Sequence, residues 1–154
     1  MKYEDIITYL EAQADPDAVK GMVKVAITGQ NVYGVSLPVL RALAKKIGKD
    51  HELALKLWQN NNRETRILAP MINEPKRVTE KQMESWVLDF DSWEVCDQCC
   101  MNLFEKLPFI HLKAKEWAKR EEEFVKRTGF VLMARLAVSD KNAGDDIFNE
   151  FFPY

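Results

Sequence analysis

The sequence predicts an all-α fold, an α-solenoid of nine or ten helices arranged as stacked antiparallel hairpins. Apolar residues recur with the 3.6-residue period of a helix in almost every segment, and no segment shows the alternation of a half-buried strand. The segments 41–47 and 66–72 also share the pattern R-x-L-A-x-x-I at a spacing of 25 residues, close to the length of one helical hairpin. A hairpin repeated at this spacing favours an open stack of helix pairs over a closed four-helix bundle.

Capping residues, prolines and glycines mark the ends of the predicted helices. Each boundary combines such a residue with the start or the end of an apolar stripe. The helices delimited in this way run from Asp15-Pro16 to about Ile27, from Ser36 to Gly48, from Asp50 onward, from Thr79 with its capping-box partner Gln82, from about Trp93 to Lys106, from about Ile110 to Arg120, from Glu121 to Val138, and from near Ala143 to the end of the chain.

Length and composition predict one soluble domain over residues 1–154. The 154 residues are 47% hydrophobic and 30% charged, and the six glycines and six prolines are too few for a linker-rich chain. No apolar run approaches the roughly 18 residues of a membrane span, so we expect no membrane contact. The first five residues, MKYED, contain no apolar signal sequence, so the expected compartment is the cytoplasm.

Charge is divided unevenly along the chain, although the net charge is only −2. Residues 78–105 hold seven acidic residues and one basic residue, whereas residues 106–135 hold eight basic residues and four acidic ones. If the chain binds nucleic acid, the second region is where we expect the contacts. The alternative is that both regions are solvated helix faces with ordinary salt bridges.

Asp97 interrupts the expected helix from Trp93 to Lys106. On a projection with about 100° per residue, Trp93 falls within the apolar stripe, Asp97 lies on its border one turn later, and Glu94 and Glu105 point away. Two interpretations remain open. Asp97 and Trp93 either form part of a functional site, or they are an edge carboxylate paired with a neighbouring helix and a core aromatic.

Arg127 breaks the pattern of the helix from Glu121 to Val138. The projection places its guanidinium within the stripe formed by Phe124, Val131 and Ala134. Removing an arginine from water without a partner costs several kcal/mol, so an anion must lie near it. That anion is either a carboxylate such as Asp97, in a structural ion pair, or the phosphate of a ligand.

The chain offers no expected metal or cofactor site. Its three cysteines, Cys96, Cys99 and Cys100, share about one helical turn and have no second CxxC pair, so we interpret them as reduced core thiols. The glycines are not spaced as in a phosphate-binding loop. We therefore expect no metal and no cofactor.

Three segments together carry a family resemblance: YGVSLPVLR at 33–41, DSWEVCD at 91–97 and FVKR at 124–127. In this order they resemble the AlkD-type DNA alkylation repair family, HEAT-like α-solenoids that excise alkylated purines. The resemblance implies a single HEAT-like repeat domain that binds double-stranded DNA containing alkylated purines in a concave groove. It also implies a monofunctional glycosylase for cationic N3- and N7-alkylpurines that does not flip the damaged base.

The resemblance implies roles for individual residues as well. Asp97 is the expected catalytic carboxylate, Trp93 the expected active-site aromatic, and Arg127 the expected active-site arginine. A positively charged alkylpurine is a good leaving group, so one carboxylate that stabilises the oxocarbenium-like sugar is sufficient. The residues expected to contact DNA are Lys126, Arg127, Lys119, Arg120 and Tyr33.

The end of the chain departs from the family pattern. Family members continue beyond the position of Tyr154 into further helices, so we expect a C-terminally truncated domain. Phe148, Phe151, Phe152 and Tyr154 crowd the last seven residues, which predicts self-association through this end. The alternative function is a helical-repeat module that binds DNA or protein without catalysis.

Overall fold

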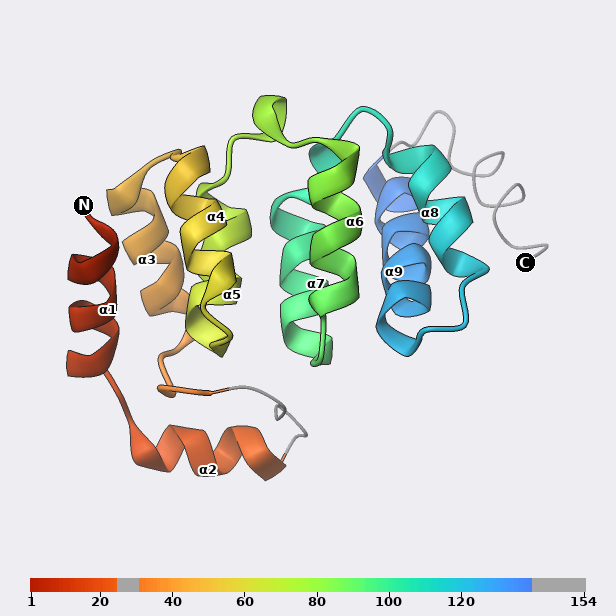
Figure 1. Ribbon diagram of the computed structural model, residues 1–154. Coiled ribbons are helices and arrows are strands. Elements are labelled where there is room, and N and C mark those ends of the chain that lie inside the picture. Colours follow the sequence, from red (N-terminus) through yellow and green to blue (C-terminus); the bar gives the residue numbers. More distant parts are fainter. Residues whose placement is uncertain (25–30, 140–154) are drawn as a thin grey trace. The chain divides into compact units, whose positions relative to one another are not determined.

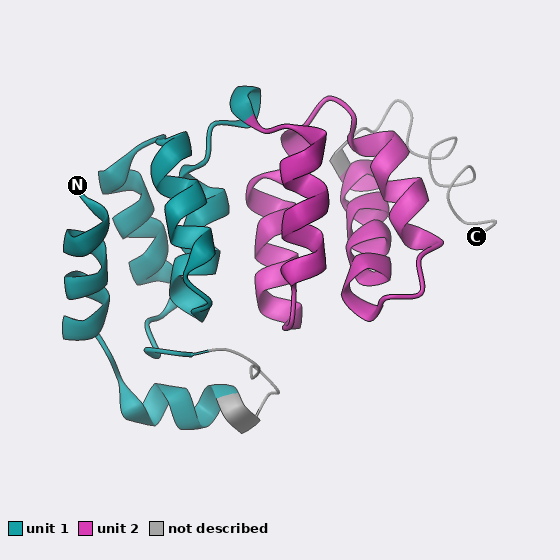
Figure 2. Ribbon diagram, in the orientation of Figure 1, with its two compact units in different colours: residues 1–77 teal, residues 78–154 magenta. Residues whose placement is uncertain are grey.

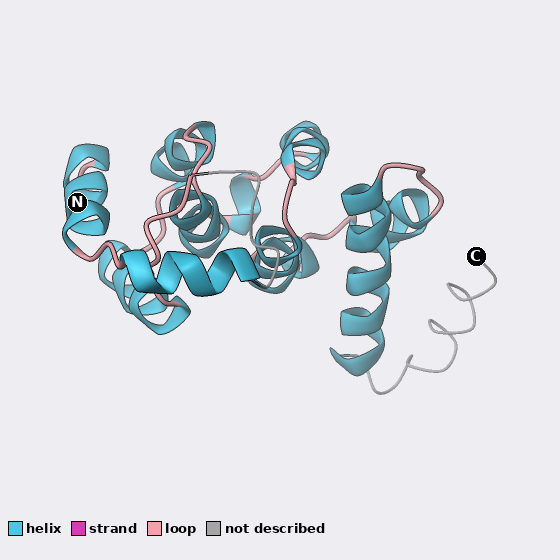
Figure 3. Ribbon diagram, turned by 90° about the horizontal axis from the view of Figure 1, so that it is seen from below, coloured by secondary structure: helices cyan, strands magenta, loops and turns pink. Residues whose placement is uncertain are grey.

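The computed structural model describes residues 1–24 and 31–139, which form nine α-helices and two short 3₁₀-helices (Figure 1). Within these ranges the only β-type pairing is an isolated bridge between Asn31 and Asn62, and Figure 3 shows helices joined by loops. The predicted all-α class is confirmed for the described residues. The helix predicted near Ala143 and the aromatic residues 148–154 lie outside them.

The chain divides into two compact units, residues 1–77 and residues 78–154 (Figure 2). In unit 1, residues 1–24 and 31–77 form five α-helices and one 3₁₀-helix. They are α1 (Tyr3–Ala12), α2 (Pro16–Lys24), α3 (Leu37–Ile47), α4 (His51–Gln59), α5 (Arg63–Ile72) and η1 (Pro75–Arg77).

Helices α4 and α5 form an antiparallel hairpin in unit 1, and α3 packs against α5. The repeated pattern R-x-L-A-x-x-I therefore lies on two helices that are neighbours in space. Several predicted caps are present: Gly48 ends α3 with a φ of 80°, and the Asp50 side chain accepts a hydrogen bond from the Leu53 amide at 3.1 Å. The caps and the repeat thus define this part of the fold as the sequence predicts.

The described part of unit 2, residues 78–139, contains four α-helices and one 3₁₀-helix. They are α6 (Glu80–Asp89), α7 (Trp93–Asn102), η2 (Phe104–Lys106), α8 (Ile110–Ala118) and α9 (Glu123–Ser139). One predicted boundary is wrong, because α7 ends at Asn102 and does not continue to Lys106. Leu103 leaves the helical conformation, with φ −135° and ψ −59°, and η2 follows.

Helices α8 and α9 cross closely at Gly129. A Cβ atom added to Gly129 would lie 2.4 Å from the backbone nitrogen of Ala118 and 2.8 Å from the carbonyl oxygen of Ala114. Only a glycine therefore fits at this crossing.

This crossing selects a different buried face of α9 from the one predicted. The buried residues are Val125, Thr128, Leu132, Met133 and Leu136, whereas Ala134 and Val138 are exposed. The predicted stripe that included Val131 and Ala134 is thus wrong as a description of the core. The projection reflects only where apolar side chains lie along α9. The buried face also depends on Gly129, whose small size lets α8 approach.

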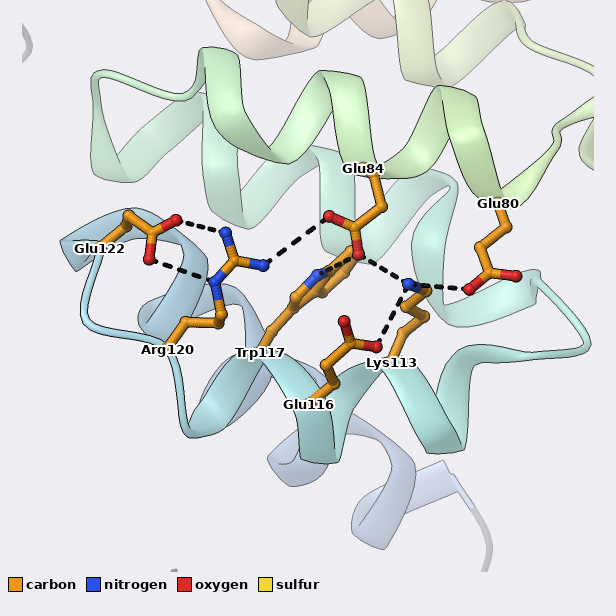
Figure 4. A network of polar contacts seen from close by, with 7 residues as sticks. All are labelled: Glu80, Glu84, Lys113, Glu116, Trp117, Arg120 and Glu122. Carbon is orange, nitrogen blue, oxygen red and sulfur yellow. Dashed lines mark hydrogen bonds and ion pairs between the residues drawn. The ribbon is translucent and has the colours of Figure 1, made fainter.

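Helices α6 and α8 are joined by a polar network around Glu84 (Figure 4). The Glu84 carboxylate accepts hydrogen bonds from Lys113 Nζ at 2.6 Å and from Trp117 Nε1 at 3.0 Å. Lys113 also pairs with Glu80 at 2.8 Å and with Glu116 at 3.2 Å. The buried lysine is thus surrounded by carboxylates, as a charge removed from water must be.

Candidate functional site

The start of α7 presents Trp93 and Asp97 on one edge of unit 2. Ser92 caps the helix, because its Oγ accepts a hydrogen bond from the Val95 amide at 3.3 Å. Residues four apart on a helix are neighbours, so Trp93 lies one turn before Asp97. Trp93 is 38% exposed and the Asp97 side chain 25% exposed, so both reach solvent.

Two details of the α7 projection are wrong. Trp93 is not a core aromatic, and Glu94, predicted to point away from the core, is buried with 7% exposure. The projection assumed a single apolar stripe. Packing covers almost all of α7, since Val95, Cys96, Cys99 and Cys100 are all buried as well.

Arg127 of α9 lies directly against Asp97. Its Nε donates a hydrogen bond to Oδ1 at 3.0 Å, and its Nη2 donates one to Oδ2 at 2.9 Å. This side-on, two-bond geometry is the arrangement that guanidinium and carboxylate groups favour. The hydrogen bonds from Arg127 to Asp97 raise the pKa of the arginine. The carboxylate partner that the sequence offered for Arg127 is therefore present.

The Arg127 side chain is not in the core, however, since it is 43% exposed. It lies at the border of the buried face of α9. Two of its five N–H groups are used by Asp97. The pair can therefore meet a ligand from the solvent side.

Cys96 of α7 and Thr128 of α9, each next in sequence to a member of this pair, also meet at the α7–α9 contact. The Cys96 sulfur lies 3.2 Å from the Thr128 hydroxyl, which donates a hydrogen bond to the carbonyl of Phe124 at 2.6 Å. All three cysteines are buried thiols, and burial raises the pKa of Cys99 and Cys100. Within residues 1–24 and 31–139, no three side chains of the metal-binding types lie together.

The basic residues predicted to contact DNA occupy different positions. Lys126 is exposed beside Arg127 on α9, and Lys119 is exposed at the end of α8. Arg120 is directed into the α6–α8 network, where its guanidinium pairs with Glu122 and lies 3.9 Å from Glu84 (Figure 4). Its charge is thus partly satisfied inside unit 2.

Tyr33 belongs to unit 1, where it lies in the segment before α3. Its backbone N–H donates to Glu64 Oε1 at 2.7 Å, and Arg63 Nη1 donates to the Val35 carbonyl at 2.7 Å. Arg63 and Glu64 are themselves a fully buried ion pair. Burial raises the pKa of the Tyr33 phenol, and the charge of Glu11 adds to this. The buried pair holds the Tyr33 segment in place.

A second arginine–carboxylate pair of unit 2, not predicted from the sequence, joins α9 to η2. Arg135 of α9 donates to both carboxylate oxygens of Glu105, which lies in η2. The spacing of these residues in the sequence could have indicated the second pair. Arg135 follows Arg127 by eight residues, and Glu105 follows Asp97 by eight residues.

The fold has a known counterpart. A solved structure described as belonging to a new family of proteins related to the HEAT-like repeat DNA glycosylases, with affinity for branched DNA structures, superposes with a TM-score of 0.81. The two sequences are 21% identical, and the match covers 89% of this chain and 58% of that one. The predicted α-solenoid of HEAT-like helical hairpins is therefore confirmed as the fold class.

The sequence comparison then identifies the family. The pattern of the DNA alkylation repair enzymes matches residues 6–151. The chain belongs to this family, as the three segments in the sequence predicted.

Two curated relatives are uncharacterized proteins of Listeria. That of Listeria innocua is 26% identical over 132 residues, and that of Listeria monocytogenes is 25% identical over 132 residues. Each match covers 83% of this chain but 59% of the relative, so the chain spans less than two thirds of the length of these relatives. None of the described helices is long and apolar enough to cross a membrane.

Proposed function

We propose that the chain carries the catalytic carboxylate of a monofunctional DNA glycosylase that hydrolyses the N-glycosidic bond of cationic N3- and N7-alkylated purines in double-stranded DNA. The observation that carries the proposal is the Asp97–Arg127 pair beside Trp93, at the solvent edge of α7 and α9. Membership of the DNA alkylation repair family supports it.

Asp97 supplies the negative charge that the reaction needs. Its two oxygens accept one hydrogen bond each from Arg127, and a carboxylate has about four acceptor positions, so both oxygens can also face a ligand. As the glycosidic bond breaks, its electron pair moves to the purine and neutralises the leaving group. Asp97 stabilises the cationic sugar left behind and orients the water that adds to it.

The water then loses a proton to solvent, and the products are a free alkylpurine and an abasic site. A general acid is not required, because the alkylated base leaves as a neutral molecule. The damaged base stays within the DNA duplex until the glycosidic bond breaks, so the protein needs no pocket to receive a flipped base. The single carboxylate on α7 is therefore a sufficient catalytic group.

Trp93 and Arg127 assist from either side of this carboxylate. The half-exposed indole of Trp93 offers its electron-rich face to the cationic sugar or base. Arg127 fixes the Asp97 carboxylate with two hydrogen bonds and uses its remaining N–H groups to contact a phosphate near the lesion. Lys126, Lys119 and Tyr33 remain proposed DNA contacts, and Arg120 contributes less because Glu122 and Glu84 already engage it.

A second candidate function is a DNA-binding module without catalysis. It is favoured by the same ion pair, because Arg127 neutralises part of the charge of Asp97. The solved structural neighbour, moreover, is described by its affinity for branched DNA. Under this hypothesis the pair orders the α7–α9 surface for backbone contacts only.

Product analysis distinguishes the two functions. The chain is incubated in excess over a duplex that carries one N7-methylguanine, and free base, abasic sites and strand breaks are measured separately. A glycosylase releases the free base and leaves an abasic site that breaks only after alkali. Binding of the duplex without any base release would contradict the proposal and support the binding module.

A further inference from the structure

The Glu105–Arg135 pair repeats the geometry of the Asp97–Arg127 pair. In both, the arginine uses its Nε and Nη2 edge to meet both oxygens of a carboxylate 30 residues earlier. The exposures are also similar. The Arg135 and Glu105 side chains are 38% and 20% exposed, compared with 43% and 25% for Arg127 and Asp97.

The free edge of Arg135 is chemically suited to a phosphate. A guanidinium has five N–H groups, and the pairing with Glu105 uses the Nε–H and one N–H of Nη2. The Nη1 edge remains able to donate. Glu105 fixes the guanidinium plane, so less side-chain freedom is lost when a ligand binds.

The spacing of the two arginines matches an extended ligand. Eight residues of α9 separate Arg127 from Arg135, and at a rise of about 1.5 Å per residue they lie roughly 12 Å apart along the helix. One strand of B-DNA carries a phosphate for about every 3.4 Å of axis, so this distance corresponds to roughly three or four nucleotides. Compact anions could not reach both side chains.

We propose that Arg135, oriented by Glu105, contacts a second backbone phosphate of the same DNA strand that Arg127 contacts. This inference rests on the proposed function for its ligand, double-stranded DNA. It adds a second anchoring point that fixes the direction of the strand along α9. Arg135 lies about two helical turns from Arg127, the partner of Asp97. It therefore acts in binding and takes no part in breaking the glycosidic bond.

The test is the salt dependence of binding to an undamaged, fluorescently labelled duplex of about 20 base pairs, in about 50 to 200 mM KCl. Loss of one phosphate contact should reduce the slope of log K against log salt by about 0.9. Arg135→Gln should therefore bind more weakly than the wild type, and its deficit should shrink about 3.5-fold across this range. Lys81→Gln removes the same charge from an exposed site on α6 and should leave the slope unchanged.

Glu105→Gln separates a DNA contact from a structural role. It breaks the same ion pair but keeps the guanidinium and removes a negative charge that repels phosphate, so we expect the salt slope of the wild type and a smaller loss of affinity than in Arg135→Gln. If Arg135→Gln and Glu105→Gln weaken binding equally and lower the melting temperature equally, the pair is structural and the inference is overturned. An Arg135→Gln slope equal to that of the wild type also overturns it.

The outcomes also separate this inference from the proposed function. If Arg135→Gln lowers the salt slope but the wild type releases no alkylpurine, the second phosphate contact is supported and the glycosylase proposal is contradicted. If the wild type releases base and Arg135→Gln binds DNA as the wild type does, only the glycosylase proposal is supported. A chain that binds no duplex overturns both.

Discussion

Arg127 and Asp97 join α9 to α7 through two hydrogen bonds of 3.0 and 2.9 Å, with both side chains partly open to solvent. Ion pairs this exposed contribute about 0 to 1 kcal/mol to stability, because water screens them. The contribution of the pair to the fold is therefore small. Its geometry fixes where a carboxylate and a guanidinium meet a ligand.

Arg127→Ala should weaken DNA binding with little loss of stability. The substitution removes one phosphate contact, so the slope of log K against log salt should fall by about 0.9. Binding titrations at several salt concentrations and a thermal melt check both parts. A large drop in melting temperature with an unchanged slope would show instead that Arg127 is an internal structural partner.

Gly129→Ala should destabilise unit 2 by about 2 kcal/mol. The new Cβ would meet backbone atoms of Ala118 and Ala114, which cannot rotate away, and the cost of overpacking outweighs the usual gain of alanine over glycine in a helix. The measurement is urea unfolding of the chain. Gly21→Ala is the matched control, since apart from its chain neighbours and the backbone of its own helix no atom lies within 4 Å of its added Cβ, and it should stabilise α2 by about 0.5 to 1 kcal/mol.

The Glu84 network should make stability depend on acidic pH. Burial opposes ionisation of Glu84, but hydrogen bonds from Lys113 and Trp117 outweigh it and lower the pKa of Glu84 from its ordinary value of 4.5. The unfolded chain therefore binds this proton more readily, and stability is lost as pH falls through the pKa of the folded state.

Urea unfolding at a series of pH values below and above about 4.5 measures this effect. Glu84→Gln should be less stable than the wild type at pH 7, and its free energy of unfolding should fall less steeply in acid. If the free energy of unfolding falls equally steeply with decreasing pH in both proteins, Glu84 is not a source of the pH dependence.

The helices could be predicted from the sequence because their ends depend on local chemistry. Asp50, Thr79 and Ser92 each accept a hydrogen bond from a backbone amide three residues later, and this geometry requires no distant partner. The Asp97 and Arg127 positions were recognised because a charge near an apolar stripe stands out. Local patterns thus sufficed for most helix starts and indicated these two positions, but they left open whether Arg127 meets Asp97 or a phosphate.

The surroundings of the site could not be predicted in the same way. The buried face of α9 depends on Gly129, whose significance appears only when α8 is placed against it. The position of Glu105 depends on the end of α7 at Asn102, where the projection ceases to apply. Both are decided by contacts between segments far apart in the sequence.

The role of Asp97 is tested most directly by single-turnover release of N7-methylguanine from a duplex by Asp97→Asn. The amide has nearly the same shape but carries no charge, so we expect an unchanged melting temperature and a loss of base release of at least about 100-fold. Asp17→Asn, the same change at an exposed position on α2, should release base as the wild type does. Near-normal release by Asp97→Asn, with the fold intact, would contradict a catalytic carboxylate at this position.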